Sequence, residues 1–291
     1  MAWRQLSLRT RHPEFAEEIL DANGAVSVSV LPTDDAEAIL EPGPGQTPMW
    51  QEALVQGLFA DDADLDPARA ALAELLPDGD GVTPDEALVP DADWVRNCLD
   101  SMTAMRFGER LWVTPHHRDV PDDDAVVVKL DPGLAFGTGT HPTTDLCLRW
   151  LDGAALAGKR VLDYGSGSGI LAVAALKLGA REAVAVDNDP QAVRASRENA
   201  INNGVADALH CCDIDAFDAG TGFDVVLANI LAEPLIALAP TLLSALRPNG
   251  DIVLAGLLDR QADRVAAAYP GIDWTREGHE GWTRLAGRST N

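Results

Sequence analysis

The feature that most limits the fold of this chain is a regular alternation of short apolar runs with helix-length segments, which begins at Ala125. The apolar runs have the length and composition of buried parallel strands and lie at 126–130, 160–163, 183–187, 207–213, 223–229 and 251–256. The helix-length segments between them lie at 170–178, 191–202, 234–246 and 259–269. This alternation predicts an α/β fold with a doubly wound, mostly parallel sheet. Two last runs, 272–277 and 282–286, predict an antiparallel pair at its edge.

The first 93 residues follow a different rhythm, in which the expected elements come in the order β-α-β-β-α. Strands are expected at 3–9, 26–30 and 53–59, and helices at 13–23 and 67–76. This order is typical of a small α+β domain of the split-βαβ, ferredoxin-like type. The segment contains no combination of residues typical of catalysis, so we expect a recognition module.

These patterns predict three parts: an α+β domain at 1–93, a connector at 94–124, and an α/β domain at 125–291. Within the connector we expect a helix at 94–105 and a short strand at 110–113. The first twenty residues lack the apolar core of a signal peptide, and no stretch has the length of a membrane span. We therefore expect a cytoplasmic protein that does not act at a membrane.

The charge balance bears on the partners of this protein. Acidic residues outnumber basic ones by 46 to 22, for a formal net charge of -24. Nucleic-acid binders depend on Lys and Arg that meet phosphates, so direct nucleic-acid binding is not expected. An acidic surface attracts basic partners at long range, although solubility or adaptation to salt would also explain the charge.

The cysteines and paired histidines do not indicate a metal site. The four cysteines form no CxxC pair, and the adjacent Cys211 and Cys212 are poorly placed for a disulfide. His116 and His117 lie side by side, but no third ligand follows at a recognisable spacing. We expect reduced, structural cysteines and no bound metal.

A glycine-rich turn follows the first strand of the α/β part. Gly165, Gly167 and Gly169 come between a buried strand and an apolar helix, and Asp163 precedes them by two residues. Glycines at such a turn let the backbone bend sharply and approach a ligand closely. In doubly wound sheets ligands bind beyond the carboxyl ends of the strands, so this turn is a candidate cofactor site.

Polar residues end two further strands of the same sheet. A carboxylate at Asp187 can accept hydrogen bonds from a ribose diol. Asp189, which precedes Pro190, is better explained as a helix cap. Asn229 ends the fourth strand, where its amide could cap the next helix or orient an amine substrate over a cofactor. Upstream, residues 130–148 hold glycines and a Thr-rich helix start, in which we interpret His141 as structural.

DYGSGSG together with Asp187 resembles the cofactor site of class I S-adenosylmethionine-dependent methyltransferases. The segments LDPGLAFGTGTHPTT and LANILAEPL resemble, more narrowly, the bacterial methyltransferases of large-subunit ribosomal protein eleven, the PrmA family. The resemblance implies a Rossmann-like methyltransferase sheet and S-adenosyl-L-methionine as cofactor. The residues that it implies at the cofactor are Thr144, Gly165, Asp187 and Asn229, with Asp213 near the adenine.

The resemblance also implies an activity. Methyl groups would pass to lysine ε-amino or N-terminal α-amino groups of that ribosomal protein, which the N-terminal domain would recognise. Related sequences usually carry Ser-Trp where this chain has His116-His117, so the geometry between its domains could differ. The alternatives are the same chemistry on another protein's lysine or on RNA, and a nucleotide-binding module without catalysis.

The residues that follow Asn229 favour an aliphatic amine as substrate. Methyltransferases of planar amides or adenine usually carry two prolines and an aromatic residue after this asparagine, whereas this chain has Ile230, Leu231 and Ala232. No general base is evident in the sequence, so we expect Asn229 to orient an amine that loses its proton to water.

Overall fold

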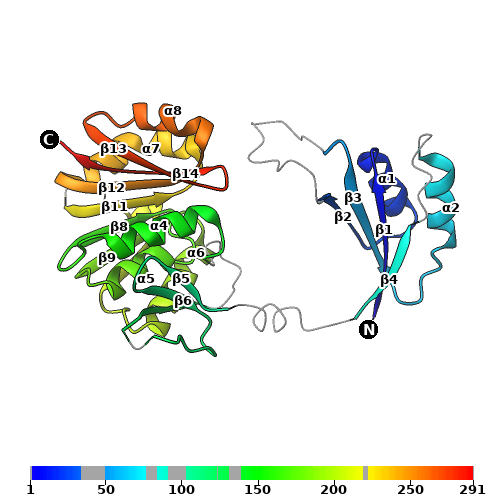
Figure 1. Cartoon of the computed structure of the whole chain (residues 1–291), viewed down its shortest axis with the longest axis horizontal. Coiled ribbons are helices and arrows are strands. Elements are labelled where there is room, and N and C mark those ends of the chain that lie inside the picture. The colour runs from blue at the N-terminus through cyan, green and yellow to red at the C-terminus, as the bar shows by residue number, and fades with distance from the viewer. Residues whose placement is uncertain are drawn as a thin grey trace. The chain divides into compact units, whose positions relative to one another are not determined.

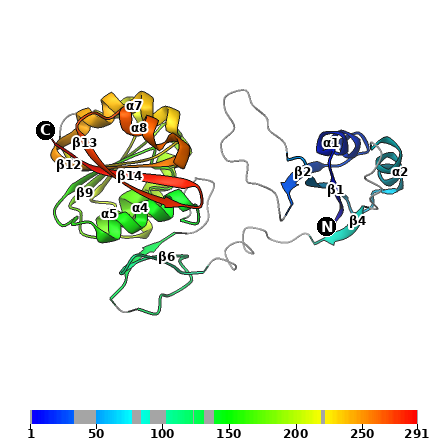
Figure 2. The same ribbon diagram turned by 45° about the horizontal axis from the view of Figure 1, so that its top comes forward.

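The computed structural model describes residues 2–33, 50–76, 84–90, 103–122, 124–130, 139–218 and 222–290. The chain divides into two compact units, Met1–Trp94 and Val95–Asn291, each with its own hydrophobic core. Most of the helix expected at 94–105 lies outside the described residues. Both units are drawn in Figure 1 and Figure 2.

The first unit is a four-stranded antiparallel sheet with two helices. Its strands are β1 (Trp3–Thr10), β2 (Ser27–Pro32), β3 (Ala53–Ala60) and β4 (Asp85–Val89), in the order β2-β3-β1-β4. The helices are α1 (Pro13–Ala22) and α2 (Asp66–Leu75), both of which begin with a proline in their first turn. Alternate residues of β1 and β3, such as Leu6, Leu8 and Val55, are buried in a core that these helices share. The predicted split-βαβ order is confirmed, and β4 completes it.

The second unit is built on a seven-stranded sheet in the order β10-β9-β8-β11-β12-β14-β13. Its parallel strands are β8 (Arg160–Tyr164), β9 (Glu182–Asp187), β10 (Leu209–Asp213), β11 (Phe223–Asn229) and β12 (Leu246–Leu258). The antiparallel edge consists of β14 (Trp282–Ser289) and β13 (Ile272–His279). The expected doubly wound sheet and its antiparallel edge are both confirmed.

Helices cover both faces of this sheet, as Figure 2 shows. One face packs against α4 (Pro142–Gly153), α5 (Ile170–Lys177) and α6 (Pro190–Asn202). The other packs against α7 (Ala232–Ala245) and α8 (Ala262–Ala267). Short 3₁₀ turns lie at Ile214–Ala216 and Asp259–Gln261, so the expected helix at 259–269 is shorter than predicted.

The strand order reverses beside β8. From β8 the chain winds outward through β9 to β10, then returns to the other side of β8 as β11. The loops that leave the carboxyl ends of β8 and β11 therefore diverge toward opposite faces of the sheet. A crevice at this position is where open α/β sheets bind ligands.

One expectation about the strands was wrong. The run at 126–130 forms β7 (Val126–Lys129), but this strand belongs to a separate three-stranded sheet and not to the large one. It pairs in parallel with β6 (Leu111–Thr114), which pairs in turn with β5 (Met105–Phe107). Met105 thus begins a strand, although we expected it to end a helix. An apolar run cannot by itself select between two sheets, because both offer it a buried position.

Candidate functional site

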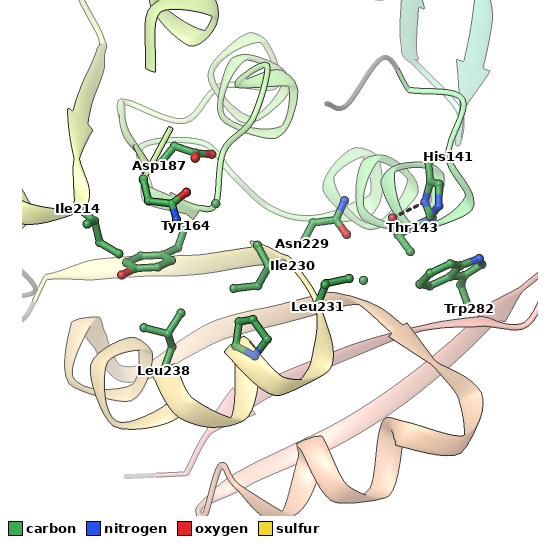
Figure 3. A pocket seen from close by; sticks show the side chains of 14 residues that line it. His141, Thr143, Tyr164, Asp187, Ile214, Asn229, Ile230, Leu231, Leu238 and Trp282 are labelled. Atoms are coloured by element: carbon green, nitrogen blue, oxygen red, sulfur yellow. Dashed lines mark hydrogen bonds between the residues drawn. The ribbon is translucent and has the colours of Figure 1, made fainter. Parts of the chain in front are cut away.

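A cavity of about 450 Å³ opens at the carboxyl ends of β8, β9 and β11. Its wall is formed by His141, Thr143, Tyr164, Gly165, Asp187, Asn188, Ile214, Asn229, Ile230, Leu231, Pro234, Leu238, Gly256 and Trp282. In Figure 3, Asp187, Tyr164, Ile214 and Leu238 lie toward one end and His141, Thr143 and Trp282 toward the other, with Asn229 between them. Three of the predicted site residues, Gly165, Asp187 and Asn229, are thus brought to one cavity.

The glycine-rich turn forms the floor beside Ile230. Gly165 has φ +76°, and its N–H donates to the carbonyl of Val186 at 2.8 Å, which ties the turn to the end of β9. A Cβ on Gly165 would lie 2.3 Å from Cγ2 of Ile230. Gly169 also has a positive φ, and a Cβ there would meet Ser196 of α6. The turn therefore requires glycine both for its conformation and for close packing.

The Asp187 carboxylate is held in one orientation by two backbone donors. Its Oδ2 accepts the N–H of Gly167 at 2.8 Å, and its Oδ1 accepts the N–H of Asp189 at 3.0 Å. Each carboxylate oxygen can accept a further hydrogen bond, so the group remains able to bind two hydroxyls. Asp189 itself caps α6, because its side chain accepts from the N–H of Gln191 at 2.8 Å, as predicted.

Asn229 and Thr144 lie next to each other on the α4 side of the sheet. The Asn229 Nδ2 donates to the Oγ1 of Thr144 at 3.5 Å. Thr144 is buried and does not belong to the cavity wall as described, so it contacts the cavity through Asn229. Asp213 accepts the N–H of Asp215, and it is its neighbour Ile214 that lines the cavity. The cofactor contacts expected of Thr144 and Asp213 stay predictions.

Several wall residues were not identified from the sequence. Tyr164 ends β8 on the face opposite Asp163, and its ring meets Phe217 edge-on at 5.7 Å. Trp282 begins β14 and meets the ring of His141 at 4.9 Å and 68°. Tyr164 could have been found, because it ends a strand beside the glycine-rich turn. Nothing local to Trp282 indicates a site.

His141 caps α4, in agreement with its structural interpretation, and it also lines the cavity. Its Nδ1 accepts the N–H of Thr143 at 3.3 Å. Burial lowers the pKa of His141, and the negative charge of Glu280 opposes this only in part. The ring is therefore neutral near pH 7, and the nitrogen that could act as a base is already used by the helix.

Asp163 is a buried carboxylate behind the glycine-rich turn. It is 1% exposed, and its Oδ2 accepts the N–H of Ala172 at 3.0 Å, whereas its Oδ1 has no hydrogen-bond partner among the residues that the structure describes. Burial raises the pKa of Asp163 to about 7, and the nearby Asp187 adds to the shift. It does not line the cavity as described.

Neither the thiols nor the histidines of the described residues form a metal site. Cys147, Cys211 and Cys212 are free and buried, and burial raises the pKa of all three thiols. No group of three or more His, Cys, Asp or Glu side chains in the described ranges could hold a metal ion. His116 and His117 are exposed on a turn after β6. No helix in the part of the chain that the structure covers is long and apolar enough to cross a membrane.

The chemistry of the wall fits a nucleoside that carries an alkyl chain. Tyr164, Ile214 and Leu238 offer a flat apolar surface for a base, and the fixed Asp187 carboxylate offers two acceptors for a ribose diol. Gly165 has no side chain, so a ligand can come close to the backbone at the floor of the cavity. Asn229 supplies an amide between the Asp187 end and the Trp282 end of the cavity.

Comparison with known proteins identifies the family. The family model described as "Ribosomal protein L11 methyltransferase (PrmA)" matches residues 2–290. Curated proteins named ribosomal protein L11 methyltransferase are similar over 99% of both chains, at 48% identity in Pseudomonas aeruginosa and 46% in Chromohalobacter salexigens. A crystal structure described as ribosomal protein L11 methylase, from Lactobacillus delbrueckii subsp. bulgaricus, is 34% identical with a TM-score of 0.59. It covers 65% of this chain and 100% of its own. The chain therefore belongs to the ribosomal protein L11 methyltransferase family.

Proposed function

We propose that this protein transfers methyl groups from S-adenosyl-L-methionine to lysine ε-amino groups, N-terminal α-amino groups, or both, of ribosomal protein L11. The observation that carries the proposal is the meeting of Gly165, Asp187 and Asn229 around one apolar cavity at the strand reversal. Family membership over the whole chain supports the substrate. Because that substrate is made and assembled in the cytoplasm, we place the enzyme there.

In this proposal the two ends of the cavity have different tasks. Asp187 would hold the ribose, and Tyr164, Ile214 and Leu238, which lie at the same end of the cavity, would pack against the adenine. Asn229, with Thr144 as its hydrogen-bond partner, would act at the reacting methyl. When bound, the cofactor supplies an electrophilic methyl group on a positively charged sulfur.

The substrate nitrogen must be neutral before it can attack. A lysine titrates near 10.4, so to deprotonate it at pH 7 costs about 4–5 kcal/mol. His141 cannot readily take that proton, because its Nδ1 already accepts the N–H of Thr143. We infer that the proton leaves to water and that the apolar wall disfavours the charged amine. Asn229 then orients the lone pair toward the methyl, and this orientation lowers the barrier.

Two features favour a protein amine over RNA. The chain carries a net charge of -24, which repels phosphates and attracts a basic protein. The two residues directly after Asn229, Ile230 and Leu231, line the cavity and are aliphatic, so they offer no flat platform for a base as substrate. The N-terminal unit, a small sheet covered on one face by two helices, is the part that we propose to recognise the ribosomal protein.

The proposal is tested with labelled cofactor and, in separate reactions, purified ribosomal protein L11 and purified ribosomal RNA, with the labelled residues of the protein identified by mass spectrometry. We expect label on amino groups of ribosomal protein L11 only when both proteins are present. Label on ribosomal RNA but not on ribosomal protein L11 would overturn the proposal.

Asn229→Ala tests the mechanism within this proposal. We expect kcat to fall by a factor of about 10 to 100, the size of a lost orienting contact of about 1.5–3 kcal/mol, at every pH between about 7 and 10. Asn202→Ala replaces an exposed asparagine at the end of α6 and is the matched control. Full activity of Asn229→Ala would remove this residue from the mechanism.

A further inference from the structure

The tip of the hairpin formed by β13 and β14 reaches the cavity from a distant part of the sequence. The turn runs through Glu280 and Gly281, both with positive φ, and places Trp282 in the cavity wall. Figure 3 shows Trp282 beside Thr143 and His141, at the end of the cavity away from Asp187. If Asp187 holds the ribose, Trp282 therefore lies where the substrate amine arrives.

Contacts with α4 fix the position of this tip. His279 Nδ1 lies 3.1 Å from Oδ2 of Asp145, a residue of α4 that is 134 positions away in the chain. Arg149 binds the same carboxylate through its Nε, at 2.8 Å and 2.9 Å. The Trp282 ring also packs edge-on against His141, the residue that caps α4. Trp282 is thus held from both sides of the turn.

The charge pattern of the wall is uneven. Asp187 is the single carboxylate among the described residues that line the cavity, and it lies at the opposite end from Trp282. The wall of the amine end instead contains an aromatic ring, a neutral histidine and hydroxyl and amide groups, and Glu280, whose charge acts on His141, lies on the hairpin turn outside this wall. A carboxylate there would raise the pKa of the amine and keep it protonated, whereas an aromatic face attracts a cation without a full negative charge.

We propose that Trp282 is the specificity-determining residue of the amine end, where its ring packs along the alkyl stem of the amine and faces its nitrogen. The inference rests on the proposed function. In the transfer, the nitrogen lone pair forms the new N–C bond while the C–S bond breaks and its electron pair stays on sulfur. The positive charge thereby moves from sulfur to nitrogen, which then loses a proton to water if it carries one. The ring of Trp282 stabilises the cation at the position to which the charge moves.

This arrangement has a consequence for repeated transfer. A carboxylate acceptor would lose its hydrogen bonds as N–H groups are replaced by methyl groups. A ring face binds a methylated nitrogen as well as an unmethylated one, because the attraction depends on charge and contact and not on N–H donors. Trp282 therefore admits an amine that already carries methyl groups.

The binding test uses the S-adenosylhomocysteine-loaded protein and three peptides that differ at one residue: lysine, trimethyllysine and a neutral carbon isostere of trimethyllysine. We expect wild type to bind trimethyllysine more tightly than the isostere. Trp282→Leu should weaken trimethyllysine binding about tenfold and abolish the preference for trimethyllysine over the isostere. Trp282→Phe should keep most of this preference. Affinity for S-adenosylhomocysteine should not change in either variant. Trp274→Phe, in the same hairpin but outside the cavity wall, is the matched control.

The same variants are then assayed for product distribution on ribosomal protein L11. With Trp282→Leu we expect KM for the protein to rise about tenfold, and products with one methyl group to accumulate. His279→Ala removes the contact between the hairpin tip and Asp145. It should also raise KM and increase the share of products with one methyl group, but by less than Trp282→Leu does. Unchanged peptide preference and product distribution in Trp282→Leu would overturn the inference while the proposed function stands. A wild type that labels no protein amine would overturn the proposed function, and this inference with it.

Discussion

The carboxylate of Asp187 accepts the backbone N–H of Gly167 at 2.8 Å, so the end of β9 and the turn after β8 are joined by the group expected to bind the ribose. The carbonyl of Val186 adds two more links, from the N–H groups of Gly165 and Ser166 at 2.8 Å and 3.0 Å. The turn and the carboxylate are therefore preorganised, and little ordering remains to be done when a ligand binds.

This relationship predicts a large effect of Asp187→Ala on cofactor binding. The substitution removes both diol acceptors and the bond to Gly167, so we expect affinity for S-adenosylhomocysteine to fall by a factor of about 10 to 100. Isothermal titration calorimetry measures this directly. Asp189→Ala is the matched control, because it removes the cap of α6 and should lower stability by about 1 kcal/mol with little effect on affinity. Equal loss of affinity in both variants would contradict the assignment.

The floor of the cavity gives a second prediction. Gly165→Ala would place a Cβ 2.3 Å from Ile230 at a φ of +76°, so it should lower both stability and cofactor affinity. Gly204 has a similar φ of +68° but nothing within 4 Å of an added Cβ. Gly204→Ala should therefore cost only the backbone strain, about 1 kcal/mol, and leave binding intact. Urea unfolding gives the stability of the two variants, and calorimetry gives their cofactor affinity, so the comparison separates backbone strain from the steric clash with Ile230. Unchanged cofactor affinity in Gly165→Ala would contradict this description of the cavity floor.

Much of the site could be anticipated because it follows from the ends of strands. Gly165, Asp187 and Asn229 each lie at a carboxyl end, and parallel strands bring such ends to one edge. Thr144 lies close to them, but its side chain is buried and hydrogen-bonded to Asn229. The sequence of α4 does not reveal this burial. Trp282 could not be found, because it reaches the cavity only through the pairing of β12 with β14.

The fold was predictable to a similar degree. The α/β alternation indicated the large sheet and its edge hairpin, and the β-α-β-β-α order of the first 93 residues indicated the small antiparallel domain. The run at 126–130 was assigned to the wrong sheet, since the pairing partner of β7 is set by tertiary contacts. One such contact is Asp152 of α4, whose carboxylate accepts the N–H groups of Glu109 at 2.5 Å and Leu111 at 3.1 Å.

Asp152 therefore gives a prediction for stability. Asp152→Ala would leave the buried N–H of Leu111 and the part-buried N–H of Glu109 without this acceptor, a cost of about 2–3 kcal/mol. Asp152→Asn should cost less, because one oxygen is kept. Chemical denaturation gives the change in free energy of unfolding. Asp145→Ala, also on α4 but bound by the exposed side chains of Arg149 and His279, should change it by less than about 1 kcal/mol. A smaller effect for Asp152→Ala than for Asp145→Ala would contradict this.

Asp163 predicts how stability depends on pH. Burial raises its pKa to about 7 in the folded chain, above the usual value of 3.8, so the folded state holds this proton more tightly than the unfolded state. The protonated Asp163 therefore makes its full contribution to the free energy of unfolding below about pH 4. This contribution, on the order of a few kcal/mol, is lost as pH rises toward and through 7. Asp163→Asn cannot lose a proton and keeps an oxygen for the N–H of Ala172.

Unfolding free energies of wild type and Asp163→Asn, measured by urea titration from about pH 4 to 8.5, should therefore diverge as pH rises. The difference curve should favour the variant increasingly between about pH 4 and 7 and flatten above that range, because other titrating groups contribute equally to both proteins. A flat curve for Asp163→Asn would show that the buried carboxyl titrates normally, which would require water or another donor at its unpartnered Oδ1.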